Sequence, residues 1–217
     1  MSIRASLILA ASALLSMSVA LAQGPTPQPV PVPKPAMPVA GAPSDAPIPP
    51  PPPIPGKAWI LIDYDSGQVI AGQNMDERLE PASITKIMTS YVVGAEMRNG
   101  KVKADDMVHI SERAWREGGA GTEGSFSALE LNSNVKLEDV LHGLIIQSGN
   151  DAAIALAEHV AGSEESFVAL MNQYAARLGM TNSHFENAHG LSMPGHYMSV
   201  RDVSTLSRAL IREFPQE

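Results

Sequence analysis

The sequence predicts a mixed α+β domain, and three observations lead to this fold class. Two short apolar runs, at residues 58–62 and 68–71, flank a turn and predict a β-hairpin. Apolar residues then recur at helical spacing in several segments between Ser83 and Phe214. No later segment has the pattern of the strands that would complete a sheet. We therefore predict an N-terminal hairpin of the sheet plus a helical block, with the C-terminal strands missing.

The hairpin prediction rests on residue types as well as on alternation. Ala58-Trp59-Ile60-Leu61-Ile62 combines aromatic and β-branched residues, as buried strands do. Asp65-Ser66-Gly67 provides a turn, and Gln68-Val69-Ile70-Ala71 is the returning strand.

The first helix is predicted over Ser83–Arg98, with Asn99-Gly100 as its stop signal. Its apolar face is formed by Ile84, Ile87, Met88, Tyr91 and Val92. Further helices are predicted over Leu137–Gln147, Asp151–Val160, Ser163–Leu178 and Ser199–Phe214. Ser199 and Asp202 have the spacing of a capping box at the start of the last one.

Residues 1–22 have the pattern of a cleavable secretory signal peptide. Arg4 gives a positive start, an apolar run follows, and Ala20-Leu21-Ala22 has the small-x-small pattern of a cleavage site. The alternative is an uncleaved membrane anchor, for which the run is short and interrupted by serines. We expect the mature chain to be secreted across the cytoplasmic membrane and to act in the periplasm or cell envelope.

Residues 23–56 are predicted to be a disordered, proline-rich linker. Fifteen of the eighteen prolines lie between Pro25 and Pro55, and proline has no amide hydrogen for a helix or sheet. The segment is expected to be a stiff tether, and the alternative is a ligand for a proline-binding module. The folded domain is then predicted over residues 57–217.

The composition excludes several classes of function. The net charge is −8 and there is no run of lysine or arginine, so the chain lacks the basic surface of a nucleic-acid-binding protein or of a basic helix on a membrane surface. The absence of cysteine excludes disulfides, thiolate metal sites and a lipidated cysteine.

Ser83 and Lys86 form the strongest candidate site. Pro81 suits the first position of a helix, so Ser83 is expected in the first turn, beside unpaired backbone N–H groups and the positive end of the helix dipole. Lys86, three residues on, shares the same helical face. A lysine amine can accept the serine proton only if its pKa is lowered by burial or by a second cation. The pair therefore predicts a serine nucleophile with a lysine base.

The motif Ser-x-x-Lys occurs a second time, at Ser133-Asn134-Val135-Lys136. The motif alone is therefore weak evidence for a catalytic site. It lies in a polar turn before a predicted helix, where both side chains are expected to be solvated. The plain alternative for Ser83 is a helix-capping serine beside an exposed lysine.

Ser148-Gly149-Asn150 lies between two predicted helices and is the only Ser-x-Asn in the chain. Gly149 permits a sharp turn, so the Ser148 hydroxyl can relay a proton while the Asn150 amide holds a substrate carbonyl. The alternative is a helix cap at Asn150.

Ser-x-x-Lys followed after about sixty residues by Ser-x-Asn is the motif order of penicillin-binding proteins and serine β-lactamases. From Lys57 to the end, the chain resembles the D-alanyl-D-alanine carboxypeptidases among the low-molecular-mass penicillin-binding proteins. The stretches that carry the resemblance begin at AWILIDYDSG, IIQSGNDAAI and NSHFENAHGL. The resemblance implies a β-lactamase/transpeptidase-like domain.

The resemblance also implies what the residues do. Ser83 would be the acylated nucleophile, Lys86 its base and Ser148 a catalytic residue, with Asn150 binding substrate. The substrate would be the D-Ala-D-Ala terminus of a peptidoglycan stem peptide. β-Lactam antibiotics would be covalent inhibitors, and neither a cofactor nor a metal is expected.

One family motif has no counterpart in the sequence. Lys-Thr-Gly or a close variant is absent, and no lysine follows Lys136. In the family that strand supplies a second cation beside the base lysine. We therefore expect residues 57–217 to be the N-terminal part of the catalytic domain, this chain to be an inactive fragment, and membrane association to need a missing C-terminal segment.

Two other functions remain as alternatives. A class A-like β-lactamase would carry Glu-x-x-Leu-Asn after the second motif, which the sequence lacks. A non-catalytic cell-wall-binding module would not be acylated by penicillin.

Two further stretches have alternative interpretations. His184, His189, His196 and Glu186 could be read as zinc ligands, but their spacing matches no zinc motif and the resemblance implies scaffold without metal. The glycine-rich run at residues 118–124 lacks the Gly-Lys-Ser/Thr of a phosphate loop and is predicted to be a mobile surface loop near the site.

Overall fold

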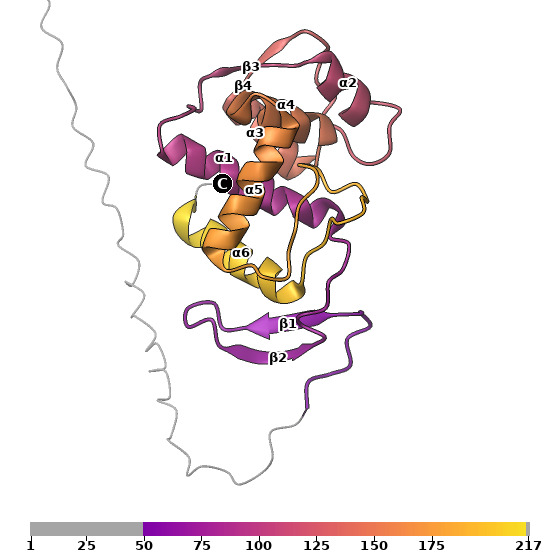
Figure 1. The fold of residues 1–217 in the computed structure, drawn as a ribbon, viewed down its shortest axis with the longest axis vertical. Helices are drawn as coiled ribbons and strands as arrows, with labels where there is room; N and C mark the ends of the chain where they lie inside the picture. The colour runs from indigo at the N-terminus through magenta and orange to yellow at the C-terminus, as the bar shows by residue number, and fades with distance from the viewer. Residues whose placement is uncertain (1–49, 216–217) are drawn as a thin grey trace, which may run out of the picture. The chain divides into compact units, whose positions relative to one another are not determined.

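The structure, a computed structural model, describes residues 50–215 (Figure 1). The predicted signal at residues 1–22 and the predicted linker as far as residue 49 lie outside the described residues. Residues 50–56, the end of that predicted linker, are exposed and form neither helix nor strand. None of the helices in the described part of the chain is long and apolar enough to cross a bilayer.

The predicted hairpin is present. β1 (Trp59–Ile62) and β2 (Val69–Gln73) pair antiparallel, with Trp59 opposite Gln73, and the register shifts near the end of β1. The returning strand begins one residue later and ends two residues later than predicted. The turn between the strands is closed by the Asp63 carboxylate, which accepts a hydrogen bond of 2.8 Å from the backbone N–H of Ser66.

One side of the hairpin packs on the helical block and the other is open. β1 contacts α6 (Val200–Glu213), the helix next to the hairpin in Figure 1. The side chains of Leu61 and Ile70 are 52% and 62% exposed. The described residues therefore leave apolar hairpin surface uncovered.

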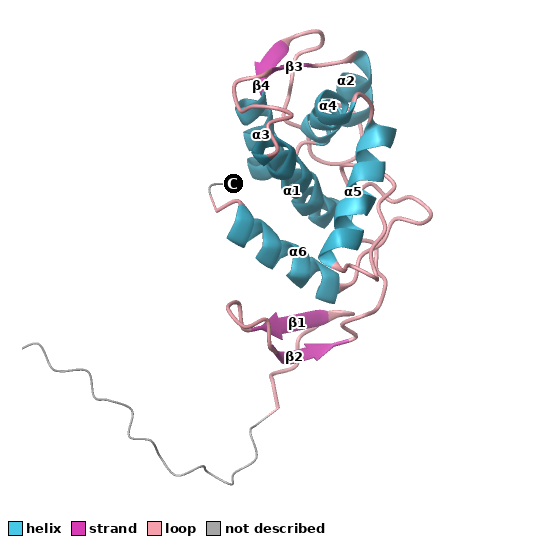
Figure 2. Ribbon diagram, turned by 60° about the vertical axis from the view of Figure 1, so that its left-hand side comes forward, coloured by secondary structure: helices cyan, strands magenta, loops and turns pink. Residues whose placement is uncertain are grey.

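The five predicted helices are all observed, each within two residues of its expected ends. They are α1 (Thr85–Arg98), α3 (Leu137–Ile146), α4 (Asn150–Ala161), α5 (Glu164–Leu178) and α6. α1 contacts the other four, and it runs among them in Figure 2. A side chain on α1 can therefore meet groups from several parts of the sequence.

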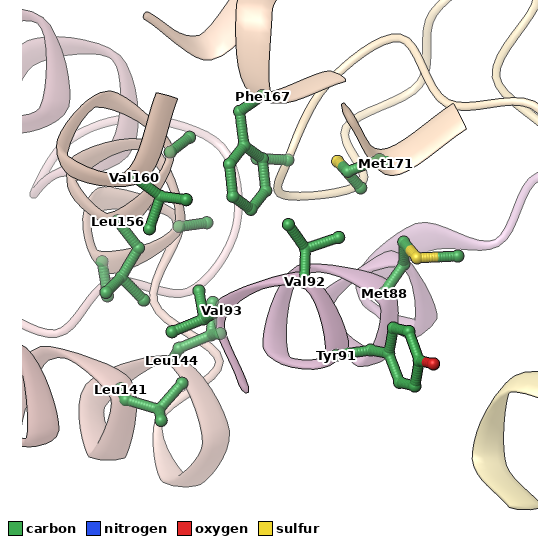
Figure 3. Close-up of a cluster of buried hydrophobic side chains, with 14 of the residues drawn as sticks. Met88, Tyr91, Val92, Val93, Leu141, Leu144, Leu156, Val160, Phe167 and Met171 are labelled. Carbon is green, nitrogen blue, oxygen red and sulfur yellow. The ribbon is translucent and has the colours of Figure 1, made fainter. Parts of the chain in front are cut away.

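The core lies around α1 and α4. Every residue of α4 from Asn150 to Ala157 is buried, and four of these are alanines, whose small side chains allow neighbouring helices to approach closely. Figure 3 shows Val92 of α1 near Phe167 of α5, both fully buried. α1 also contacts α4 directly, so this core sets the position of the two helices relative to each other.

The last helix begins as predicted but its cap is only half a capping box. The Ser199 hydroxyl accepts a hydrogen bond from the backbone N–H of Asp202 at 3.2 Å. The Asp202 carboxylate does not return to Ser199; it accepts from the backbone N–H of Asn182 and the hydroxyl of Ser183. Asp202 thus ties α6 to the loop that precedes it.

Three short elements escape prediction from the sequence. β3 (Met107–His109) and β4 (Asn134–Lys136) form a second antiparallel pair, and α2 (Glu112–Gly118) follows the capping residue Ser111. The segment expected to be a polar turn before α3 therefore contains a strand. Three-residue strands and a seven-residue helix are too short for alternation or helical periodicity to be visible.

Candidate active site

Ser83 lies in a single turn of 3-10 helix, Ala82–Ile84, directly before α1. The sequence predicts that the α-helix begins at Ser83, but the α-helix begins at Thr85 and Ser83 belongs to the 3-10 turn before it. Ala82 has a positive φ of 47°, an unfavourable region for a residue with a Cβ. Gly190 packs so closely on the Ala82 carbonyl that a Cβ at position 190 would collide with it. The turn that presents Ser83 is therefore held by a loop distant in sequence.

Lys86 is buried at the start of α1, with 6% of its surface exposed. Its Nζ lies 3.3 Å from Ser83 Oγ, 2.7 Å from Asn150 Oδ1 and 2.7 Å from the backbone oxygen of His189. Three segments of the chain thus converge on one amine.

Burial lowers the pKa of Lys86 to about 8, and the negative charge of Asp151 acts in the opposite direction. A lysine with this pKa is mostly protonated at pH 7, with roughly one tenth in the neutral form. The neutral amine can accept a proton from the serine hydroxyl beside it. The sequence left open whether burial or a second cation would lower this pKa. In the described part of the chain, burial is the cause.

The Ser148-Gly149-Asn150 turn joins α3 to α4, as the sequence predicts. Ser148 has a positive φ of 57° and Gly149 precedes the first residue of α4. Ser148 lines a cavity of about 190 Å³ together with Ser83 and Lys86. The rest of the cavity wall is mostly apolar, with Ile87, Leu144, Ile145 and Leu210. Ser90 also lines the cavity, so an acyl chain bound there would meet three serine side chains and one amine on an apolar surface.

Asn150 does not cap the helix, in contrast to the alternative interpretation. Its Oδ1 accepts from Lys86, and its Nδ2 donates to the Glu123 backbone oxygen at 3.1 Å. Its own backbone N–H donates to the Ser125 oxygen at 2.8 Å. The glycine-rich segment therefore lies against the second motif, as expected for a loop near the site.

The Asp151 side chain binds the residues that follow the glycine-rich segment. Its buried carboxylate accepts backbone N–H bonds from Ser127 at 2.7 Å and from Leu129 at 3.2 Å. Gly118 leaves no room for a Cβ, because the backbone of Asp151 packs directly on it. Asn150 and Asp151 therefore bind residues 123–129 directly beside the second motif.

Residues 187–190 are the part of the site that sequence reasoning missed, because it assigned this loop to the scaffold. The His189 oxygen binds Lys86. The Asn187 Oδ1 accepts from the backbone N–H groups of His189 at 3.2 Å and Gly190 at 2.6 Å, and Thr89 of α1 donates to the Ala188 oxygen at 2.6 Å. Every residue has a backbone carbonyl, so no residue type signals this contact.

The other Ser-x-x-Lys stretch forms no such pair. Ser133 donates to the Glu130 backbone oxygen at 2.7 Å, whereas Lys136 is exposed and lies 3.3 Å from Glu138. Residues three apart on an extended strand point to opposite faces. The two side chains therefore do not share a site.

The three histidines of the loop do not converge on one point: Glu186 contacts both His184 and His196, and the His189 ring lies near Glu164. His196 Nε2 lies 2.8 Å from Thr85 Oγ1, and His184 Nε2 lies 3.3 Å from Glu186. Within residues 50–215 there is no cluster of three or more His, Cys, Asp or Glu side chains suited to a metal ion.

Comparisons with known proteins identify the family to which this fold belongs. A family profile described as D-alanyl-D-alanine carboxypeptidase matches residues 45–217. D-alanyl-D-alanine carboxypeptidase DacC of Escherichia coli (strain K12) is 50% identical over 165 residues, covering 76% of this chain and 41% of that protein. DacA of the same strain is 46% identical with the same coverage. The crystal structure of penicillin binding protein 5 from Haemophilus influenzae has a TM-score of 0.73 and 42% identity, covering 76% of this chain and 48% of that one.

The chain spans 41% of the length of these two curated relatives. The similarity to the solved structure confirms the predicted α+β, transpeptidase-like fold, of which this chain covers a part. The profile match extends over most of the sequence. The chain therefore belongs to the D-alanyl-D-alanine carboxypeptidase family.

Proposed function

We propose that the whole gene product is a serine-type D-alanyl-D-alanine carboxypeptidase that removes the terminal D-alanine from peptidoglycan stem peptides. One observation carries the proposal: the buried Lys86 amine lies within 3.3 Å of the Ser83 hydroxyl and 2.7 Å of the Asn150 amide oxygen. A nucleophile, a base of lowered pKa and an amide beside a cavity are the parts that acyl transfer requires. The two curated relatives are D-alanyl-D-alanine carboxypeptidases, which favours the same reaction.

The reaction would proceed through an acyl-enzyme. Neutral Lys86 takes the hydroxyl proton as Ser83 Oγ attacks the carbonyl carbon of the penultimate D-alanine. The C–N bond then breaks, and the terminal D-alanine leaves after its nitrogen receives a proton, for which the Ser148 hydroxyl is the proposed relay. Water attacks the ester and frees Ser83. In a penicillin the same attack opens the lactam ring and leaves the antibiotic attached.

We place this reaction outside the cytoplasm, in peptidoglycan biosynthesis and the control of cell shape. The signal-like pattern of residues 1–22 and the carboxypeptidase and penicillin-binding relatives support that location. The stem peptide, with its D-Ala-D-Ala end, is the proposed substrate, and β-lactams are the proposed inhibitors.

The first test compares two polypeptides in release of D-alanine from a D-Ala-D-Ala peptide. We expect the whole gene product to release D-alanine and residues 23–217 alone to release it far more slowly. Among the described residues that line the cavity, Lys86 is the only cation, so most of it stays protonated at neutral pH. Equal turnover would show that residues 23–217 contain a complete site. If the whole product neither releases D-alanine nor is labelled by penicillin, the proposed function is wrong and a non-catalytic wall-binding module is favoured instead.

The rate of acylation is expected to rise with pH. The lowered pKa of Lys86, about 8, means that the neutral base becomes more abundant as pH increases toward that value. Between pH 6 and 7 the second-order rate constant for penicillin acylation should rise roughly tenfold and then level off near or below pH 8. Stopped-flow measurement on the whole product checks this, with antibiotic hydrolysis in buffer alone as the control. A profile that is flat over this range contradicts Lys86 as the base.

A further inference from the structure

Glu164 is a buried carboxylate that the proposed reaction does not use. It is the first residue of α5, it is 5% exposed, and none of its hydrogen bonds goes to Ser83 or Lys86. A buried carboxylate is costly unless its oxygens have partners. Its partners therefore indicate what it holds in place.

The two oxygens of Glu164 join two parts of the chain. Oε2 accepts from Arg113 of α2 at 2.9 Å, and Oε1 accepts from the backbone N–H of Ala188 at 3.0 Å. Ala188 directly precedes His189, whose backbone oxygen accepts from Lys86 Nζ at 2.7 Å. A chain of contacts thus runs from α2 through Glu164 to the amine beside Ser83.

The His189 ring lies near the same carboxylate. Its Nδ1 accepts from the backbone N–H of Leu191 at 3.2 Å, which leaves the proton on Nε2, 3.6 Å from Glu164 Oε1. Burial, and then the positive charge of Lys86, lower the pKa of His189 to about 4. The ring is therefore neutral at neutral pH and adds no cation beside Lys86.

We propose that Glu164 is a positioning residue for Lys86: by binding the Ala188 N–H it fixes the carbonyl of His189 that orients the amine toward Ser83. The inference rests on the proposed acylation of Ser83. Asn187 and Thr89 hold the same loop by other bonds. Loss of Glu164 therefore shifts the carbonyl without unfolding the loop, and its effect falls on the proton-transfer step.

The test uses the whole gene product and a fluorescent penicillin, with Ser83→Ala as the blank. Glu164→Ala should lower the first-order acylation constant by about tenfold to a hundredfold, as small misplacements of catalytic groups do. The dissociation constant of the non-covalent complex and the final labelling stoichiometry should not change. A merely structural role would lower the labelled fraction or the melting temperature instead.

Two variants separate the hydrogen bond from the charge. In Glu164→Gln the amide oxygen can still accept from Ala188, so its acylation constant should stay within about threefold of the parent. Glu165→Gln is the matched control, because the Glu165 side chain also binds Arg113, at 2.9 Å, but is 71% exposed and does not bind the Ala188 N–H. It should acylate at the parent rate.

The outcomes distinguish this inference from the proposed function. If the parent is not labelled, the proposed function fails. If the parent is labelled and Glu164→Ala acylates as fast, or Glu164→Gln is as slow as Glu164→Ala, the inference is overturned. Should Glu164→Ala not fold, Glu164→Asp keeps the charge near Arg113 but draws it back from Ala188, and the same slow acylation is expected. An unaltered rate in that variant also overturns the inference.

Discussion

Replacing Ser83 by alanine is expected to abolish covalent labelling of the whole gene product by a fluorescent penicillin. Ser83 Oγ is the hydroxyl within 3.3 Å of Lys86 Nζ, and removing it leaves no oxygen for the acyl bond at this position. Gel fluorescence after exposure to antibiotic is the measurement. Release of D-alanine should disappear in the same variant.

Ser133→Ala is the matched control for this experiment, because Ser133 also precedes a lysine by three residues. Its hydroxyl binds the Glu130 backbone oxygen just before β4, so labelling should be unaffected. Equal loss of labelling in both variants would remove the structural reason for choosing Ser83.

Replacing Lys86 by alanine is expected to slow acylation by roughly 10²–10⁴-fold, the usual contribution of a general base. The variant loses the amine that accepts the Ser83 proton and leaves Asn150 Oδ1 and the His189 oxygen without their donor. The decrease should appear in the acylation rate constant measured by stopped flow.

The comparison variant here is Lys136→Ala, which removes an exposed lysine paired with Glu138 and should acylate at the parent rate. If Lys86→Ala remains within about tenfold of the parent, another group must act as the base.

The long elements of the fold can be predicted from the sequence because each repeats its pattern over several turns or residues. α5, for example, lies between Ser163, whose hydroxyl accepts from Ser166, and Gly179, which has a left-handed φ of 75°. β3, β4 and α2 cannot be predicted in this way, since they are too short to show a period and depend on tertiary contacts.

Some contacts of the candidate site can also be predicted from the sequence, whereas others depend on tertiary packing. Ser83 and Lys86 are close in sequence, so helical spacing predicts that they share a face, and the structure places them together. The contact of Asn150 with Lys86 spans 64 residues, and the sequence suggests it only through the motif order. The contribution of His189 is a backbone oxygen, and the link through Glu164 depends on how α5 packs. No residue type in the sequence indicates either of these two contacts.

The three contacts of Lys86 have a consequence for the direction of its lone pair. A neutral amine has two hydrogens and one lone pair, and the three partners differ in what they can offer. The His189 oxygen can only accept, and the Asn150 amide presents its oxygen because its nitrogen is bound to the Glu123 carbonyl. These two acceptors take both hydrogens of the neutral amine. Its lone pair is then left facing Ser83 Oγ, the one partner with a proton to give, so loss of a proton from Lys86 produces a base already aimed at the nucleophile.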